Sequence, residues 1–206
     1  MIKATLTGLA LLFLALLIVA ATKPDTFRVE RSARIEAAPE KIFPLINDFH
    51  QWEKWSPWEK ADPALKRTYS GSESGKGAIY HWDGNKDVGQ GQMEIIESTP
   101  PGKLRIKIDF LAPFEGHNTV EFTLEAQGSG TLVRHAMFGP SPYLSKLMGI
   151  FFNMDKMIGD KFEEGLINLR GLAEAKRTDF HKPEQKFRKP VDFQNTVASY
   201  TTRHFF

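Results

Sequence analysis

The chain contains no cysteine among its 206 residues, and this absence removes several kinds of chemistry. There is no disulfide, no thiolate nucleophile and no cysteine-ligated metal. The six histidines, at positions 50, 81, 117, 135, 181 and 204, show no His/Glu spacing of a metal site and no H-E-x-x-H motif. The sequence therefore predicts no metal and no cofactor, and it nominates no catalytic residue.

A surplus of basic charge is also missing from the body of the chain. Residues 23–175 carry 19 Lys/Arg against 22 Asp/Glu, a net charge of −3. Residues 176–206 carry seven against three, a net charge of +4. Nucleic-acid-binding domains typically present a basic face, so we expect no nucleic-acid partner for the body.

Residues Ala4–Thr22 lack charge altogether and consist mainly of Leu, Ala, Ile and Val. A helix of that length measures about 28 Å, near the hydrocarbon thickness of a bilayer. The segment is interpreted either as a retained membrane anchor or as a signal peptide cleaved after Val19-Ala20-Ala21. The length favours the anchor, which predicts a single-pass membrane protein with its soluble domain on the non-cytoplasmic side.

What the sequence does contain is a series of segments in which apolar and polar residues alternate. Alternation of this kind is typical of strands with one buried face, and turn signals between the segments favour antiparallel hairpins. About seven strands are expected, over residues 27–35, 65–70, 77–83, 91–98, 104–110, 120–125 and 131–138. Between the first two, a short helix begins at Ala38-Pro39-Glu40, is interrupted by Pro44, and leads to the tryptophan-rich segment 50–58.

A helical repeat dominates residues Ser141–Glu174 and predicts one long helix that begins at an N-cap, Ser141-Pro142. Its apolar positions are Leu147, Ile150, Phe151, Met154, Met157, Ile158, Phe162, Leu166, Leu169 and Leu172. Four glycines interrupt it, each costing about 1 kcal/mol relative to alanine. We interpret Gly149, Gly159, Gly165 and Gly171 as positions of close approach to a sheet. Glu163 and Glu164 are expected on the wet flank, and Asp109 is expected to be solvated.

Several stretches resemble one known group of proteins. They are residues 30–43 (ERSARIEAAPEKIF), 52–58 (WEKWSPW), 80–85 (YHWDGN) with 89–91, 110–114 (FLAPF) and 146–159 (KLMGIFFNMDKMIG). Over residues 27–175 the chain resembles the START/Bet v 1-like (SRPBCC) superfamily, in its polyketide cyclase/dehydrase-like subfamily. The resemblance implies an α+β helix-grip fold, in which a curved antiparallel sheet of about seven strands surrounds a long C-terminal helix.

The resemblance also implies an internal cavity for a small hydrophobic or lipid-like ligand. The candidate lining residues are Trp52, Trp55, Tyr69, Tyr80, Trp82, Met93, Phe110, Phe122, His135, Met154, Met157, Ile158 and Phe162. His135 is placed inward because it alternates with Val133 and Met137. The same side chains taken singly also fit an ordinary core, and this superfamily hosts binders, carriers and a few enzymes.

The expected organisation is a membrane anchor (1–24), a helix-grip domain (25–175) and a basic, aromatic tail (176–206). The main hypothesis is a membrane-anchored domain that binds a small hydrophobic ligand. One alternative is an accessory subunit that docks on a membrane complex through residues 4–22 and 176–206, although the tail fits equally well folded on its own domain. A second alternative is a cyclase/aromatase-type enzyme, which requires a convergent polar pair such as His135 with Tyr80.

Overall fold

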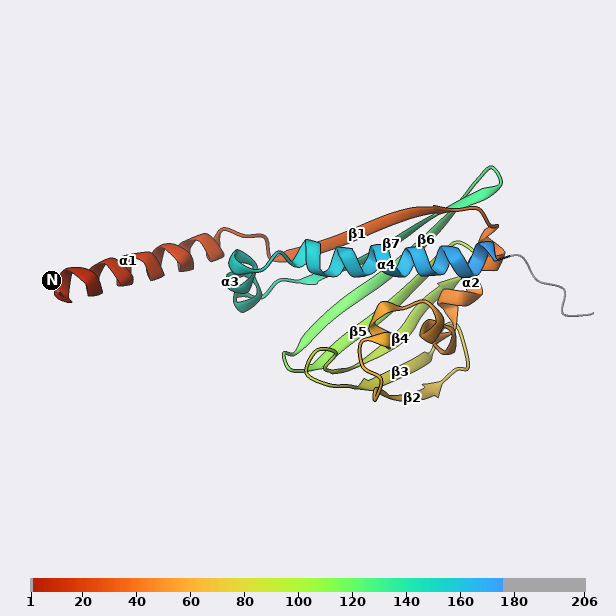
Figure 1. Cartoon of the computed structure of the whole chain (residues 1–206), viewed down its shortest axis with the longest axis horizontal. Helices are drawn as coiled ribbons and strands as arrows, with labels where there is room; N and C mark the ends of the chain where they lie inside the picture. Colours follow the sequence, from red (N-terminus) through yellow and green to blue (C-terminus); the bar gives the residue numbers. More distant parts are fainter. Residues whose placement is uncertain (1, 176–206) are drawn as a thin grey trace, which may run out of the picture. The chain divides into compact units, whose positions relative to one another are not determined.

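The computed structural model describes residues 2–175, so the predicted basic tail lies outside the described residues. The chain begins with α1 (Ile2–Ala21), and the domain that follows occupies residues 26–174 (Figure 1). The segment expected as a transmembrane anchor thus forms a helix. Among the helices of the described residues, none combines the length and the hydropathy that crossing a membrane requires.

The domain is built on one sheet of seven antiparallel strands in the order β1-β7-β6-β5-β4-β3-β2. The strands are β1 (Thr26–Ile35), β2 (Lys66–Gly71), β3 (Ala78–Asp83), β4 (Gln90–Thr99), β5 (Lys103–Ala112), β6 (Gly116–Gln127) and β7 (Gly130–Pro140). Each strand from β2 to β7 pairs with the next one along the chain, and β1 adds to the outer edge of β7. The seven predicted strands and their antiparallel pairing are confirmed.

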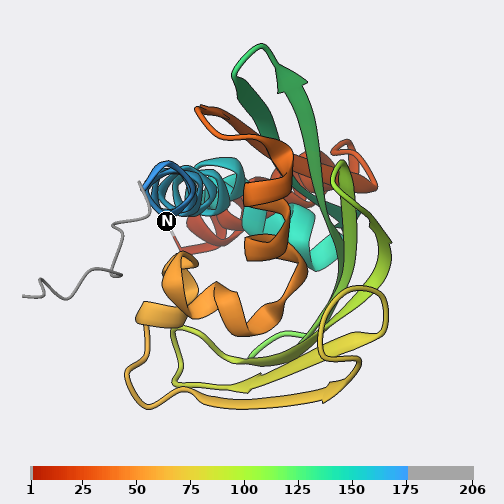
Figure 2. The same ribbon diagram turned by 90° about the vertical axis from the view of Figure 1, so that its right-hand side faces the viewer.

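The sheet is strongly curved, and Figure 2 shows it curling around the helices on its concave side. Its concave face is apolar because the inward positions of each strand are hydrophobic, as in β5, where Leu104, Ile106 and Ile108 are buried. Irregularities in the β4–β5 register between Gln90 and Gly91 and between Ile95 and Glu97 favour bending of this sheet. The concave side holds α2 (Pro39–Asn47), the 3₁₀ helices η1 (Phe49–Lys54) and η2 (Pro57–Lys60), and α4 (Met154–Glu174).

The prediction of a single helix over 141–174 is wrong, because the chain forms two helices. They are α3 (Tyr143–Phe151) and α4, and of the two residues between them Phe152 has extended backbone. Asn153 begins α4 by accepting a hydrogen bond from the backbone N–H of Lys156 at 3.0 Å. An asparagine at this position competes with continuation of the preceding helix by capping a new one. The expected cap Ser141-Pro142 makes no side-chain capping bond to α3.

The glycines of these helices fall into two groups. A methyl group added at Gly159 would collide with the guanidinium of Arg31, and one added at Gly165 would press against Pro57 and Trp55. At Gly149 and Gly171, nothing lies within 4 Å of the added atom. Close approach is therefore confirmed at two of the four glycines, although the approaching groups are side chains rather than the sheet backbone.

Asp109 differs from its prediction as a solvated residue, since it is buried on the convex face of the sheet. Its carboxylate accepts a hydrogen bond from Nδ1 of His117 at 2.7 Å and pairs with Nζ of Lys107 at 2.8 Å. Burial opposes its ionisation, but the bonds from Lys107 and His117 outweigh burial and hold the pKa of Asp109 below its usual value. Asp109 is therefore part of a polar cluster on the side of the sheet away from α4.

Candidate functional site

Two tryptophans attach the helices to the concave face. The indole N–H of Trp52 donates to the carbonyl of Ile46 at 3.0 Å, and that of Trp55 donates to the carbonyl of Leu45 at 2.9 Å. These carbonyls belong to the last turn of α2, where no intrahelical donor remains. The two rings are buried 4.8 Å apart, and both meet Phe122 edge-on. The tryptophan segment thus fills the middle of the domain.

His135 lies in a sandwich of aromatic rings. Its imidazole stacks on Phe122 at a centroid distance of 4.1 Å and on Phe162 of α4 at 3.7 Å. Its Nδ1 is buried without a hydrogen-bond partner. Burial lowers the pKa of His135 to about 3, so the ring is neutral at pH 7. The prediction that His135 points inward is confirmed, and its role is to pack α4 against β7.

A second buried polar group lies nearer the β3 side of the sheet. The hydroxyl of Tyr80 donates to the carboxylate of Glu59 at 2.7 Å, and Nε of Arg67 donates to the other oxygen of that carboxylate at 2.7 Å. Burial and the neighbouring carboxylate raise the pKa of Tyr80 far above its usual value. The side chain of Glu59 thus accepts from two donors, which is the pairing that a buried carboxyl group needs.

The predicted site residues divide into three groups by exposure. Those buried between the sheet and the helices are Trp52, Trp55, Tyr80, Trp82, Met93, Phe122, His135 and Phe162. Those packed on this core but still partly exposed are Tyr69, Phe110 and Ile158. Met154 and Met157 lie outside the cluster, at 47% and 58% exposure. The structure therefore brings most of the predicted residues together, but as a filled core in the middle of the domain.

The core becomes accessible at one end of the sheet, which we call the open end. It comprises the start of β1, the β5–β6 turn and the end of β7, which the strand register places side by side. Phe27 of β1 and Phe110 of β5 lie at this end, and Ile158 stands in the second turn of α4. All three side chains pack on the core yet stay partly exposed. The ring of Phe110 meets the indole of Trp82 edge-on at 5.8 Å. The open end therefore exposes apolar surface next to the buried aromatic side chains of the core.

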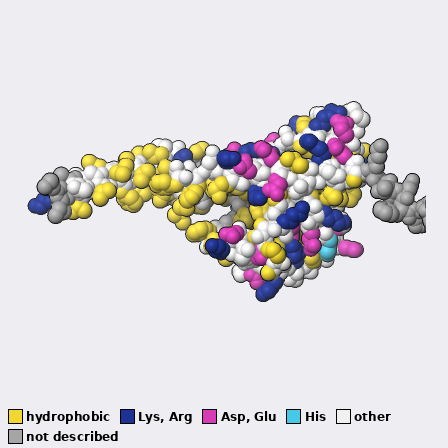
Figure 3. Space-filling model, in the orientation of Figure 1, with side chains coloured by type: hydrophobic (Ala, Val, Ile, Leu, Met, Phe, Trp, Pro, Cys, Tyr) yellow, Lys and Arg dark blue, Asp and Glu magenta, His cyan; other side chains and the backbone are white. Residues whose placement is uncertain are grey.

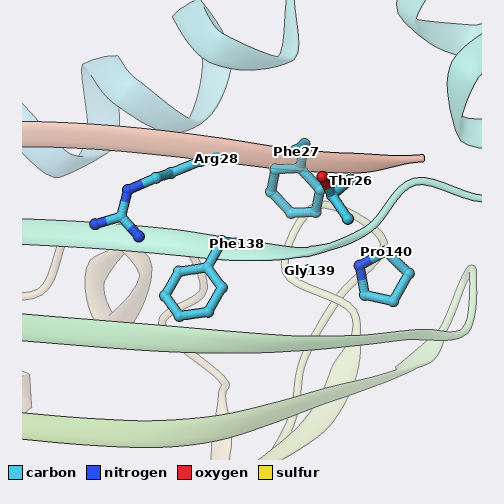
Figure 4. A pocket seen from close by; sticks show the side chains of 6 residues that line it. All are labelled: Thr26, Phe27, Arg28, Phe138, Gly139 and Pro140. Atoms are coloured by element: carbon cyan, nitrogen blue, oxygen red, sulfur yellow. The ribbon is translucent and has the colours of Figure 1, made fainter. Parts of the chain in front are cut away.

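A hollow and a pocket lie near this end of the sheet (Figure 3). Figure 3 shows a hollow bordered by hydrophobic side chains beneath α3 and the first turns of α4. A separate pocket of about 660 Å³ lies where β1 begins and β7 ends (Figure 4). Its lining residues are Thr26, Phe27, Arg28, Phe138, Gly139 and Pro140. Its lining is mainly apolar, and it is a shallow depression open to solvent rather than an enclosed cavity.

The fold and this site can now be compared with known proteins. A sequence profile of the family described as polyketide cyclase/dehydrase and lipid transport matches residues 26–174. The chain belongs to this family. The match covers the whole of the domain and leaves α1 outside it, in agreement with the predicted resemblance. A search of curated proteins finds no match.

Solved structures share the fold of this family member at low sequence identity. A Chromobacterium violaceum protein, CV1439, is 16% identical with a TM-score of 0.52, covering 75% of this chain and all of its own. Ginseng (Panax ginseng) major latex-like protein 151 is 11% identical with a TM-score of 0.55, covering 74% of this chain and all of its own. The di-domain ARO/CYC protein StfQ, from the steffimycin biosynthetic pathway, is 10% identical with a TM-score of 0.53. The match covers 72% of this chain and 51% of StfQ. These likenesses establish the helix-grip fold.

Two residues important at the site were not singled out from the sequence. Glu59 stands in a run of charged and aromatic residues that gives no sign of a buried carboxylate. Phe27 reads as one of several inward strand positions, and only the pairing of β1 with β7 places it at the open end. The sequence signal that could have identified Phe27 is its position near the start of the first strand.

Proposed function

We propose that this domain binds a small hydrophobic or lipid-like molecule in the hollow at its open end. The observation that carries the proposal is that Phe27, Phe110 and Ile158, from three separate elements, each pack on the core and remain partly exposed. Partly exposed apolar surface next to a closed core is the arrangement that a hydrophobic ligand covers. The lipid-transport description of the family supports the same class of ligand.

Binding is favoured over catalysis by the positions of His135 and Tyr80, one candidate for the convergent polar pair that a cyclase/aromatase-type enzyme needs. The hydroxyl of Tyr80 is engaged by Glu59, and the imidazole of His135 is enclosed by two phenyl rings. Within the described residues no hydrogen bond joins His135 to Tyr80, so the convergent pair expected for a cyclase is not formed. StfQ carries an aromatase/cyclase description, but at 10% identity it supports only the fold.

We also propose that α1 inserts into a lipid bilayer and so keeps the binding domain beside a reservoir of such ligands. The support is the exposure of its apolar side chains, which is 62% at Leu11 and 60% at Phe13. Exposed apolar surface on this scale marks a membrane or protein interaction site. The non-cytoplasmic location of the domain stays a prediction, as does the docking of residues 176–206 on a partner protein.

The ligand proposal is tested on the full chain purified from membranes in mild detergent. We expect native mass spectrometry to show one bound amphipathic molecule, and we expect Ile158→Asn to lose most of it by making the apolar surface polar. The matched control is Ile167→Asn, because Ile167 lies on the same helix but is 63% exposed. A wild-type protein that carries no bound molecule and takes up none from added lipid extract would contradict the proposal.

A further inference from the structure

Exposed apolar side chains gather around the hollow from two sides of the molecule. One group belongs to α3, the α3–α4 junction and the first turn of α4, and the other to the β5–β6 region. We call the set the apolar rim, and it consists of Phe114, Leu144, Phe151, Phe152 and Met157. Phe114 is 71% exposed and Phe151 is 64% exposed. Figure 3 shows hydrophobic side chains continuing from α1 over α3 to the border of the hollow.

The apolar side chains of α1, the helix next to the rim, indicate which environment surrounds that helix. Leu11, Leu12, Phe13 and Leu14 follow one another at steps of about 100°, so together they cover nearly the whole circumference of the helix. All four are more than half exposed. A single protein surface covers one side of a helix, whereas lipid surrounds it. The side chains of α1 therefore fit a lipid environment better than a docking partner.

Two contacts fix the rim next to the end of α1. The hydroxyl of Tyr143, at the start of α3, donates to the carbonyl of Leu17 at 2.8 Å. Nζ of Lys146 donates to Asp25, just before β1, at 2.5 Å. Leu17 lies four residues before the end of α1, or about 6 Å along its axis. When α1 is in lipid, α3 is therefore at the level where the helix leaves it, and tyrosine is a residue that favours this interface.

On the helical side of the rim, several charged side chains are paired within the domain. Arg31 pairs with Asp155 at 3.0 Å, and Lys156 pairs with Asp160 at 2.6 Å. The burial of Lys146 is likewise compensated by Asp25. Contact of the rim with a bilayer thus needs no anionic headgroup, and hydrophobic insertion is its main driving force.

We propose that the apolar rim docks on the surface of the bilayer that holds α1, so that the hollow opens toward the lipid. The inference rests on the proposed function of α1 and adds a second, independent membrane contact made by the domain itself. It also gives the ligand a route from the bilayer to Phe110 and Ile158 that does not cross water.

Because the chain lacks cysteine, single cysteines can test this arrangement in the full-length protein. Phe114→Cys and Phe151→Cys report on the two sides of the rim, with Met157→Cys as a second position on the helical side. Leu12→Cys reports on α1, and Ile167→Cys is the exposed control. Each variant carries an environment-sensitive fluorophore and is reconstituted in phosphatidylcholine vesicles with or without nitroxide-labelled lipid.

We expect nitroxide lipid to quench the fluorophore at positions 12, 114, 151 and 157, and to leave position 167 unchanged. Quenching at position 12 alone would overturn the rim inference while leaving the proposed anchor intact. No quenching at any position would contradict both. A blue-shifted but unquenched fluorophore at 114 and 151 would show that protein, such as a second copy, covers the rim, and this also overturns the inference.

Discussion

At the scale of the residue, His135 has the clearest energetic consequence. Its alternation with Val133 and Met137 was enough to predict that it points inward. The sequence did not show that the ring lies between Phe122 and Phe162 with Nδ1 unpartnered. That arrangement depends on which α4 residue meets β7, and it turns a possible acid or base into a neutral packing residue.

His135 should make the stability of the domain fall as the pH is lowered. The unfolded chain takes up a proton on this histidine below about pH 6.5, whereas the folded state resists protonation until about pH 3. Between pH 7 and pH 5, the free energy of unfolding should therefore drop by about 2 kcal/mol from this group alone. Denaturant titrations of wild type and His135→Leu measure it. The variant should lose less stability over this interval, and equal losses would contradict the assignment.

Glu59 is the second residue whose environment predicts a measurable effect. Its side chain is 6% exposed and pairs with Arg67, which also lies 3.3 Å from the 52%-exposed Glu53. Removing one partner of a buried ion pair typically lowers the free energy of unfolding by about 3–5 kcal/mol, whereas an exposed pair contributes less than about 1 kcal/mol. We expect Glu59→Ala to lower the free energy of unfolding several-fold more than Glu53→Ala. Similar effects of the two substitutions in urea titrations would contradict a structural role for the buried Glu59–Arg67 pair.

Met154 and Met157 show where residue-level prediction failed. Both belong to the apolar repeat, but Met157 precedes Leu166 by nine residues, or two and a half helical turns. It therefore lies on the side of α4 opposite the buried Leu166. The predicted apolar face was too wide to be covered by one sheet, and the structure leaves part of it exposed at the open end.

At the scale of the element, the strands were predictable and the helix break was not. Strand alternation has a period of two, so the sequences of β5 and β6 show which side chains share a face. Their limits were less predictable, since β6 covers Gly116–Gln127 and the predicted strand covers 120–125. The apolar repeat over 141–174 continues across Phe152 and Asn153, so periodicity alone predicts a continuous helix. The break depends on the capping bond of Asn153 and on α3 turning away toward α1.

The glycines of α4 provide a test at this scale. Gly171→Ala should stabilise the domain by up to about 1 kcal/mol, because alanine favours the helix and nothing lies nearby. Gly159→Ala should lose that gain, because the new methyl group displaces Arg31 from Asp155 and Glu163. Thermal unfolding of both variants measures the difference. In an Arg31→Ala background Gly159→Ala should become stabilising, and equal gains in the wild-type background would contradict the proposed contact.

At the scale of the whole molecule, the family and the sheet topology were predictable from local motifs such as residues 52–58 and 146–159. The location of the proposed site was not, since the family resemblance implies a ligand cavity in the middle of the domain. That volume is occupied by Trp55, Phe122 and Phe162, which are almost fully buried. Open space instead lies where the sheet extends past the first turns of α4, and this depends on element lengths and curvature together.

The central claim is that the domain binds a hydrophobic ligand at its open end. The most direct measurement is a titration of the full chain with a fluorescent long-chain fatty acid, for wild type, Ile158→Trp and Ile167→Trp. The account predicts saturable one-to-one binding that Ile158→Trp abolishes by filling the hollow and Ile167→Trp leaves unchanged. Binding that never saturates, or that both variants weaken equally, would contradict it.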